Sequence, residues 1–178
     1  MSELLDDELR QMNEREFEEE MEIEEAVSVK DPIRTLELGE MVTVDEGQDL
    51  ASVIKIFQSR GAACVLVTRN KKLAGIFTER DVTLKLVGRG LDLSREKVAD
   101  YMTPSPESLK MDDPIAFALN RMTDGGFRHV PIVDERDRPV GVVAILDIIR
   151  HLASYYSDQV FNLPPEPLRK PQARPEGG

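Results

Sequence analysis

The sequence predicts an α/β (α+β) fold assembled from two copies of one unit. Gly75 and Gly141 are each followed by a short β-prone run and, six residues later, by an aspartate that opens a helix-like stretch. The same offset of 66 residues pairs the apolar strand at 64–67 with 130–133, and the apolar-periodic stretch at 50–57 with 116–123. Because the offset holds without a gap, it indicates an internal duplication.

The first repeat reads as an entry segment, a helix, a strand, a turn, a second strand and a second helix. Asp49 can cap a helix that runs to about Arg60, and Gly61 ends it. Its apolar residues fall on one face, as in a core-facing helix: Leu50, Val53, Ile54 and Phe57. The further elements expected are a strand at 64–67, a polar turn at 69–72, a strand at 73–77 and a helix from Thr78 to about Val87.

The second repeat follows the same order after a polar linker at 88–97. Asp112 or Asp113, with Pro114, marks the start of its first helix, and Gly125 with Gly126 marks the end. The elements expected after it are a strand at 130–133, a turn at 134–138, a strand at 140–144 and a helix at 146–156.

The chain divides into four segments: an acidic helical extension at 1–30, repeat one at 31–88, repeat two at 89–160 and a proline-rich disordered tail at 161–178. Residues 1–25 hold twelve acidic residues against two arginines, among strong helix formers. This extension is either a solvated helix or a helix that docks on a protein partner. The tail is either a linear partner motif or a segment without a specific role.

Charge and composition exclude several classes of protein. The net charge is −11, and the chain beyond the acidic extension is close to neutral, so nucleic-acid binding through clustered cations is not expected. No apolar run is long enough for a membrane span, and the acidic N-terminus does not read as a secretion signal. Cys64, the one cysteine, lies in an apolar strand and reads as a small buried hydrophobe. A cytoplasmic protein is therefore expected.

The reactive residue types do not form a catalytic set. The sequence has two histidines, His129 and His151. It shows no Ser-His-Asp order, no Cys-His pair, no His/Cys cluster with metal-ligand spacing and no Walker glycine loop. The sequence therefore predicts no catalytic residue, no metal site and no required cofactor.

The repeated Gly–Asp motif supports two interpretations. An aspartate in the first helical turn after a strand, such as Asp81, can cap the helix, or it can accept hydrogen bonds from two vicinal hydroxyls. Thr78 lies one turn earlier on the same face, so the pair matches a ribose with a phosphate or third sugar oxygen. A glycine at position 75 lets the backbone turn or allows the close approach of another group. On the motif alone, ribose binding and simple helix capping both remain open.

The segment Gly75–Asp81 (Gly-Ile-Phe-Thr-Glu-Arg-Asp) resembles the nucleotide motif of cystathionine-β-synthase-type (CBS) domains. Residues 127–134 resemble the family's strand before its turn, and residues 98–104 its entry segment to a repeat. The resemblance covers about 32–155 as a tandem pair. It implies two β-α-β-β-α repeats packed sheet to sheet as one module, often called a Bateman module, with two clefts. Family members bind AMP, ADP, ATP or S-adenosylmethionine in such clefts.

The resemblance also implies roles for individual residues. In the first cleft, Thr78 and Asp81 would contact ribose and phosphate, and the base would lie against Thr103 and the backbone at Phe127. Arg128 and His129 would reach the phosphates, although His129 could instead be a partly buried histidine bonded to backbone. The second cleft keeps Asp147 but has Ala144 where the first has its threonine. It is therefore expected to bind more weakly by about an order of magnitude, or not at all.

The resemblance implies a regulatory protein that senses an adenosine-containing small molecule and acts on a partner in trans. A homodimer is expected through the helices at 82–87 and 148–155, and the acidic extension or the tail could hold a protein partner. Two alternatives remain open: a sensor of S-adenosylmethionine, and a ligand-free structural or oligomerisation module.

Overall fold

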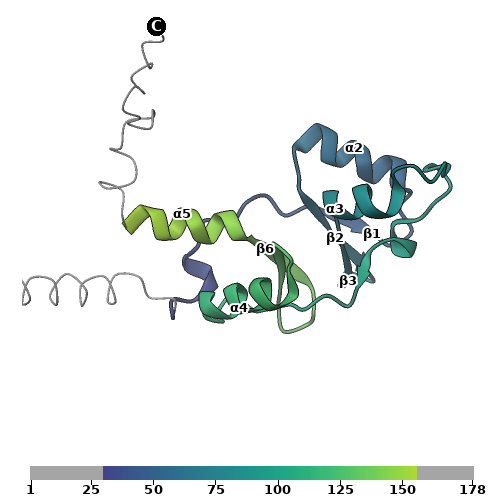
Figure 1. Cartoon of the computed structure of the whole chain (residues 1–178). Helices are drawn as coiled ribbons and strands as arrows, with labels where there is room; N and C mark the ends of the chain where they lie inside the picture. The colour runs from purple at the N-terminus through teal and green to yellow at the C-terminus, as the bar shows by residue number, and fades with distance from the viewer. Residues whose placement is uncertain (1–29, 156–178) are drawn as a thin grey trace, which may run out of the picture.

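The computed structural model describes residues 30–155, and it forms two α/β units that lie side by side (Figure 1). Residues 1–29 of the predicted acidic extension and the whole predicted tail lie outside the described residues. Within 30–155, no helix is both long enough and apolar enough to cross a bilayer.

The first repeat has the predicted order of elements. It comprises β1 (Thr43–Asp45), α2 (Leu50–Arg60), β2 (Cys64–Arg69), β3 (Lys72–Thr78) and α3 (Glu79–Asp81), which continues into the π-helical turn η2 (Val82–Leu86). Asp49 caps α2 by accepting from the N–H of Ser52 at 2.8 Å, and Gly61 ends the helix in the left-handed conformation. Both predicted helix signals are confirmed. The predicted helix from Thr78 to Val87 is corrected in kind, because Thr78 is its N-cap, Glu79–Asp81 are α-helical and Val82–Leu86 are π-helical.

The second repeat also has the predicted order. It comprises β4 (Thr103–Pro104), α4 (Ile115–Gly125), β5 (His129–Val133), β6 (Pro139–Ala144) and α5 (Ile145–Tyr155). The prediction that Asp112 or Asp113 opens α4 is corrected in detail. Pro114 is the capping position, without a side-chain hydrogen bond, while Asp113 accepts from the N–H of Lys110 at 2.8 Å.

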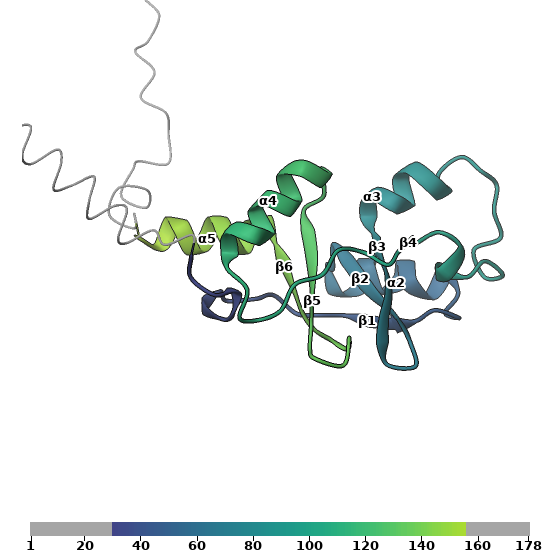
Figure 2. The ribbon, with the colours of Figure 1, turned by 90° about the horizontal axis from the view of Figure 1, so that it is seen from below.

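The entry segment of each repeat packs on the other repeat. In the four-stranded sheet β1-β2-β3-β4, β4 pairs antiparallel with β3, so that Thr103 faces Ile76 (Figure 2). Conversely, Ile33, in the short 3-10 helix η1 (Ile33–Thr35), is fully buried in the core of the second repeat. The N–H of Ile115 also donates to the carbonyl of Asp31 at 2.9 Å. Neither core is therefore complete without a segment from the other half of the chain.

A third buried cluster joins the two repeats. It contains Cys64, Leu66, Ile76 and Val142, so residues of β2 and β3 pack against β6.

Burial raises the pKa of the Cys64 thiol to about 12, which keeps the sulfur protonated and unreactive. The predicted role of Cys64 as a buried hydrophobe is confirmed.

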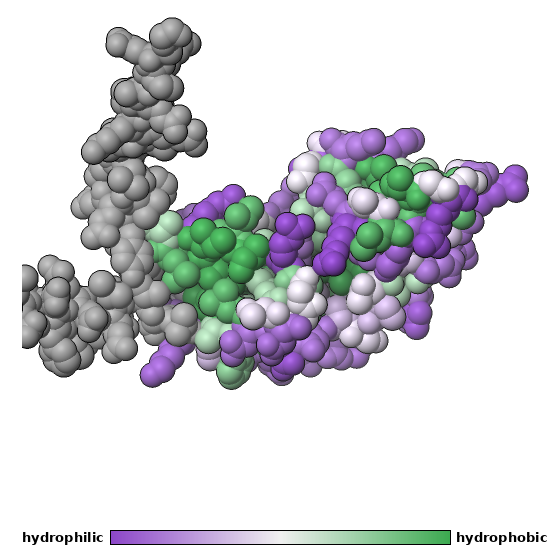
Figure 3. All heavy atoms as spheres, in the orientation of Figure 1, coloured by the Kyte–Doolittle hydropathy of each residue, from purple (hydrophilic) through white to green (hydrophobic). Residues whose placement is uncertain are grey.

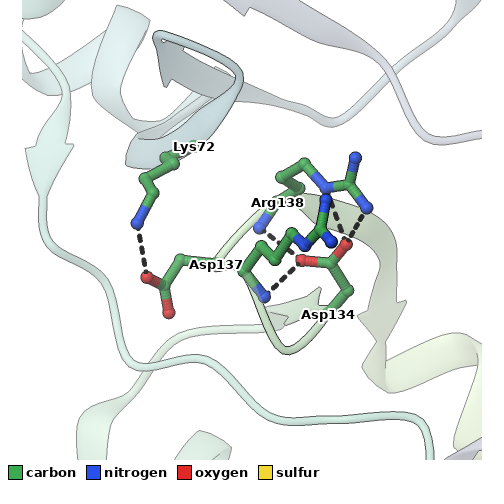
Figure 4. A network of polar contacts seen from close by, with 5 residues as sticks. Lys72, Asp134, Asp137 and Arg138 are labelled. Carbon is green, nitrogen blue, oxygen red and sulfur yellow. Dashed lines mark hydrogen bonds and ion pairs between the residues drawn. The ribbon is translucent and has the colours of Figure 1, made fainter.

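Polar contacts join the two repeats at their hairpins (Figure 4). Lys72 forms an ion pair with Asp137 at 3.1 Å, and the N–H of Leu73 donates to the carbonyl of Asp137 at 2.9 Å. Asp134 shapes the second hairpin, and the guanidinium of Arg138 lowers the pKa of its carboxyl to about 2. These contacts fix the start of β3, whereas the cavity described next lies at its end.

Candidate functional site: a cavity between the repeats

A cavity of about 510 Å³ opens where the end of β3 meets the start of β5. Its volume falls in the range of clefts that hold small organic ligands. Both repeats line it, through Ala63, Ile76, Thr78, Glu79, Arg80, Asp81, Leu84, Thr103, Pro104, Ser105, Pro106, Glu107, Gly125, Gly126, Phe127, Arg128 and His129.

The structure brings six of the seven residues predicted for the site to this one cavity. They are Thr78, Asp81, Thr103, Phe127, Arg128 and His129. Asp147, the seventh, does not line it, because it follows β6 at the start of α5. The crossing of β4 onto β3 is what places Thr103 opposite the motif of the first repeat.

Thr78 and Asp81 form a reciprocal helix cap on the cavity wall. Asp81 Oδ2 accepts from the N–H of Thr78 at 2.9 Å and from its hydroxyl at 2.7 Å, while the N–H of Asp81 donates to Thr78 Oγ1 at 3.3 Å. The capping interpretation is therefore correct. It is compatible with ligand binding, since the hydroxyl can rotate toward a ligand and free one acceptor position on the carboxylate.

Gly75, the glycine of the motif, lies directly against the entry segment of the second repeat, which leaves no room for a side chain. A Cβ atom on Gly75 would lie 2.2 Å from Met102 Sδ and 3.0 Å from the carbonyl oxygen of Thr103. Only glycine lets β4 approach β3 this closely. The close approach expected at this glycine is therefore confirmed, and the approaching group is a segment that forms a cavity wall.

The predicted phosphate end of the site carries less positive charge than its sequence suggested. Arg128 is exposed at the cavity, with its carbonyl bonded to the N–H of Ile145 at 3.0 Å. Burial, followed by the nearby charge of Arg128, lowers the pKa of His129 below its usual 6.5. His129 is therefore neutral at pH 7, so that Arg128 is a cation beside a neutral imidazole.

Three charged residues of the cavity were not predicted. Arg80 donates from Nη1 to the carbonyl of Gly126 at 3.1 Å, which connects the motif of the first repeat to the end of α4. Glu107 pairs with Arg121 at 2.8 Å, while Glu79 makes no ion pair with another described residue. The comparison of repeats could not find these residues, because Glu79, Arg80 and Glu107 align with isoleucine, leucine and methionine at the 66-residue offset.

The corresponding position of the second repeat is more buried. The side chain of Asp147 is 5% exposed, and its Oδ2 accepts from the N–H of Ala144 at 2.9 Å. Its other oxygen lies 3.3 Å from Nη1 of Arg150. Asp147 thus keeps the helix-capping bond of the motif while lacking a neighbouring hydroxyl. No metal site is added, since no group of three or more His, Cys, Asp or Glu residues among the described residues could hold an ion.

This arrangement defines a class of protein: a tandem α/β repeat with a ligand-sized cavity between its halves. A model of the CBS domain family matches residues 20–88 and 98–154. The chain belongs to the CBS domain family, as a tandem pair.

Known proteins agree with this assignment. The CBS domain-containing protein CBSCBSPB1 of Arabidopsis thaliana is 40% identical over 93 residues, which is 52% of this chain and 16% of the relative. The chain thus spans less than a fifth of that relative's length.

Among solved structures, the CBS domain pair of the protein MJ0100, in complex with 5′-methylthioadenosine and S-adenosyl-L-methionine, has a TM-score of 0.62 at 21% identity. The structural match covers 70% of this chain and 97% of the MJ0100 chain. The cytosolic domain of the Mg²⁺ channel MgtE, in complex with ATP, has a TM-score of 0.57 at 25% identity, covering 68% of this chain and 48% of that chain.

Proposed function

We propose that the cavity binds an adenine nucleotide of the AMP, ADP or ATP type, and that occupancy regulates a partner protein. The observation that carries the proposal is the composition of the two walls. One wall offers the hydroxyl and carboxylate of Thr78 and Asp81, while the other offers Thr103, Phe127 and the cation Arg128. A ribose can bond to the carboxylate, an adenine can pack on the apolar wall, and a phosphate can meet the guanidinium. The ATP complex of the MgtE domain supports the same ligand class.

Regulation follows from the position of the cavity between two halves that share segments. A ligand that touches both walls binds the assembled pair better than a loosened one, so it shifts the population toward the assembled form. A partner that recognises this form would then respond to nucleotide level. The predicted protein partner and its contact through the acidic extension or the tail are part of this proposal.

Thermal unfolding with adenosine, AMP, ATP and S-adenosylmethionine at millimolar concentration tests the proposal. A ligand present at about 100 times its Kd adds about 2.7 kcal/mol to the free energy of unfolding, which raises Tm by several degrees. We expect such a shift with at least one adenine nucleotide. The absence of a shift with every compound would instead favour a ligand-free structural or oligomerisation module, in which Thr78 and Asp81 act only as a helix cap.

A second candidate ligand is S-adenosylmethionine. It carries a positive sulfonium and ammonium beside its adenosine, and the cavity contains the carboxylate of Glu79 without an ion-pair partner among the described residues. A Tm shift that is larger with S-adenosylmethionine than with AMP, and that Glu79→Gln reduces selectively, would favour this ligand over a nucleotide.

A further inference from the structure

The carboxylate of Asp81 is held from behind by a lysine that does not line the cavity. Lys85 Nζ lies 2.8 Å from Asp81 Oδ1, while the other oxygen accepts from the amide and hydroxyl of Thr78. The side chain of Asp81 is 14% exposed and that of Lys85 is 36% exposed. The pair is therefore more enclosed than an ordinary surface ion pair, for which the interaction is weak.

A second contact fixes the ammonium of Lys85 in place. Its Nζ donates to the carbonyl oxygen of Tyr101 at 2.6 Å, two residues before Thr103 on the opposite wall. Lys85 lies in the π-helical turn η2, where the N–H of Val87 donates to the carbonyl of Val82 at 3.2 Å. Such wide turns recur at functional sites because they redirect a side chain locally. The ammonium of Lys85 is thus held between the carboxylate of Asp81 and the backbone carbonyl of Tyr101.

The acceptor positions of the carboxylate show what this anchoring achieves. A carboxylate offers about four acceptor positions, and here Thr78 occupies two and Lys85 one. Oδ1, which Lys85 contacts, already has one free position, and Oδ2 gains one when the hydroxyl of Thr78 turns to a ligand. Two free positions on two oxygens match two vicinal hydroxyls. Without Lys85, the Oδ1 side of the carboxylate loses the donor that fixes its rotation.

We propose that Lys85 is a positioning residue that holds Asp81 oriented for the two ribose hydroxyls of the ligand. This inference rests on the proposed function, because it needs a ribose at Asp81. It assigns to Lys85 a selective role: the residue supports recognition of the diol and contributes little to the rest of the ligand.

Titration calorimetry with adenosine and 2′-deoxyadenosine on wild type, Lys85→Met and Lys55→Met tests the inference. Methionine keeps the apolar stem and removes the charge, and Lys55 is an exposed lysine on α2 that serves as the matched control. We expect wild type and Lys55→Met to prefer adenosine, and Lys85→Met to lose about tenfold of that preference. Its affinity for 2′-deoxyadenosine should change little.

The other outcomes are distinct. If Lys85→Met weakens both nucleosides equally, or neither, the positioning role is wrong while the proposed function stands. If wild type binds neither nucleoside, the inference fails, and the proposed function fails with it only if AMP and ATP do not bind either.

A measurement on wild type covers the case in which Lys85→Met does not fold. The ammonium of Lys85 should give a slowly exchanging ¹⁵Nζ signal by NMR that moves with adenosine more than with 2′-deoxyadenosine. Equal movement with the two nucleosides, or none, would overturn the inference.

Discussion

Asp81 and Asp147 make the same backbone hydrogen bond in the two repeats. Each carboxylate accepts, at 2.9 Å, from the N–H of the residue three positions before it, Thr78 or Ala144. The two residues differ in their surroundings: Asp81 lines the cavity, whereas Asp147 is buried beside Arg150. The duplicated aspartate therefore has a common structural role, and the first copy is the one that lines the cavity.

The first prediction separates these roles. Asp81→Ala should abolish most measurable binding of adenosine and AMP, because it removes the carboxylate that we propose accepts from the ribose hydroxyls. Asp147→Ala should affect binding less and instead lower the free energy of unfolding by about 1–3 kcal/mol, because it leaves the part-buried amide of Ala144 without its acceptor. Calorimetry measures the first effect and urea unfolding the second.

The matched control is Asp147→Asn, whose amide oxygen can still accept the bond from Ala144. It should recover much of the stability lost in Asp147→Ala. Equal loss of nucleotide affinity in Asp81→Ala and Asp147→Ala would disprove the asymmetry between the two copies.

The second prediction concerns the phosphate end of the cavity. The double variant Arg128→Ala, His129→Ala should weaken AMP by about tenfold, the lower end of what a lost charge-assisted bond costs, because Arg128 is exposed. Adenosine, which lacks a phosphate, should be affected little, whereas Asp81→Ala should weaken both. Calorimetry with the two ligands decides, and equal weakening would mean that these residues act by packing.

The third prediction uses the lowered pKa of His129. Between that lowered pKa and 6.5, the unfolded state binds a proton that the folded state does not, so stability rises with pH through this window. The free energy of unfolding should therefore fall as the pH drops below about 6.5. Subtracting the curve of His129→Gln from that of wild type isolates the contribution. A difference that is flat across this window would show that His129 is not held neutral.

The fourth prediction compares the two motif glycines. Gly75→Ala should lower the free energy of unfolding by about 1–3 kcal/mol, because the new methyl group would overlap Met102 and press on the backbone oxygen of Thr103. Gly141→Ala should cost less, since its nearest neighbours are the ends of Leu38 and Met111, at 3.0 and 3.3 Å, which can move. Denaturant unfolding of both variants provides the test. A larger loss for Gly141→Ala would contradict the close-approach argument.

The fifth prediction concerns self-association. Exposed apolar side chains lie on the helices that follow each motif, with Leu84 63%, Leu146 57% and Ile149 50% exposed, and Figure 3 shows apolar areas over both repeats. Ile148, at the start of the segment 148–155 expected to form this contact, does not contribute to it, because this residue is fully buried in the core. We propose a homodimer through these helices at micromolar concentration.

Light scattering tests the proposal. Leu146→Glu with Ile149→Glu should shift the protein toward monomer, while Thr123→Glu, an exposed position on α4, should not. A clean wild-type monomer at ~100 μM would rule out the dimer.

Local signals explain which elements could be predicted from the sequence. The helix α2 was predictable because a capping aspartate and a terminating glycine mark its two ends. The strands β1 and β4 were not, because at three and two residues they are too short to show periodicity. Their pairing with distant segments is a tertiary effect.

The same reasoning applies to the site. Sequence reasoning could find the residues that the two repeats share and those in the segments that resemble CBS motifs, and six of these residues line the cavity. Arg80 and Lys85 could not, because their roles depend on the carbonyls of Gly126 and Tyr101, which lie 46 and 16 residues away in sequence. The low pKa of His129 likewise follows from burial, which composition does not reveal.

The position of Ile33 also has a consequence for synthesis on the ribosome. This residue is fully buried against residues of α4, β5 and α5 that are made more than eighty positions after it. A nascent chain that has exposed only the first repeat must leave Ile33 and Leu36 in water until the last helix emerges. Because loops this long close slowly, the second core should be the last to form during translation, and chaperones would meet the chain in that interval.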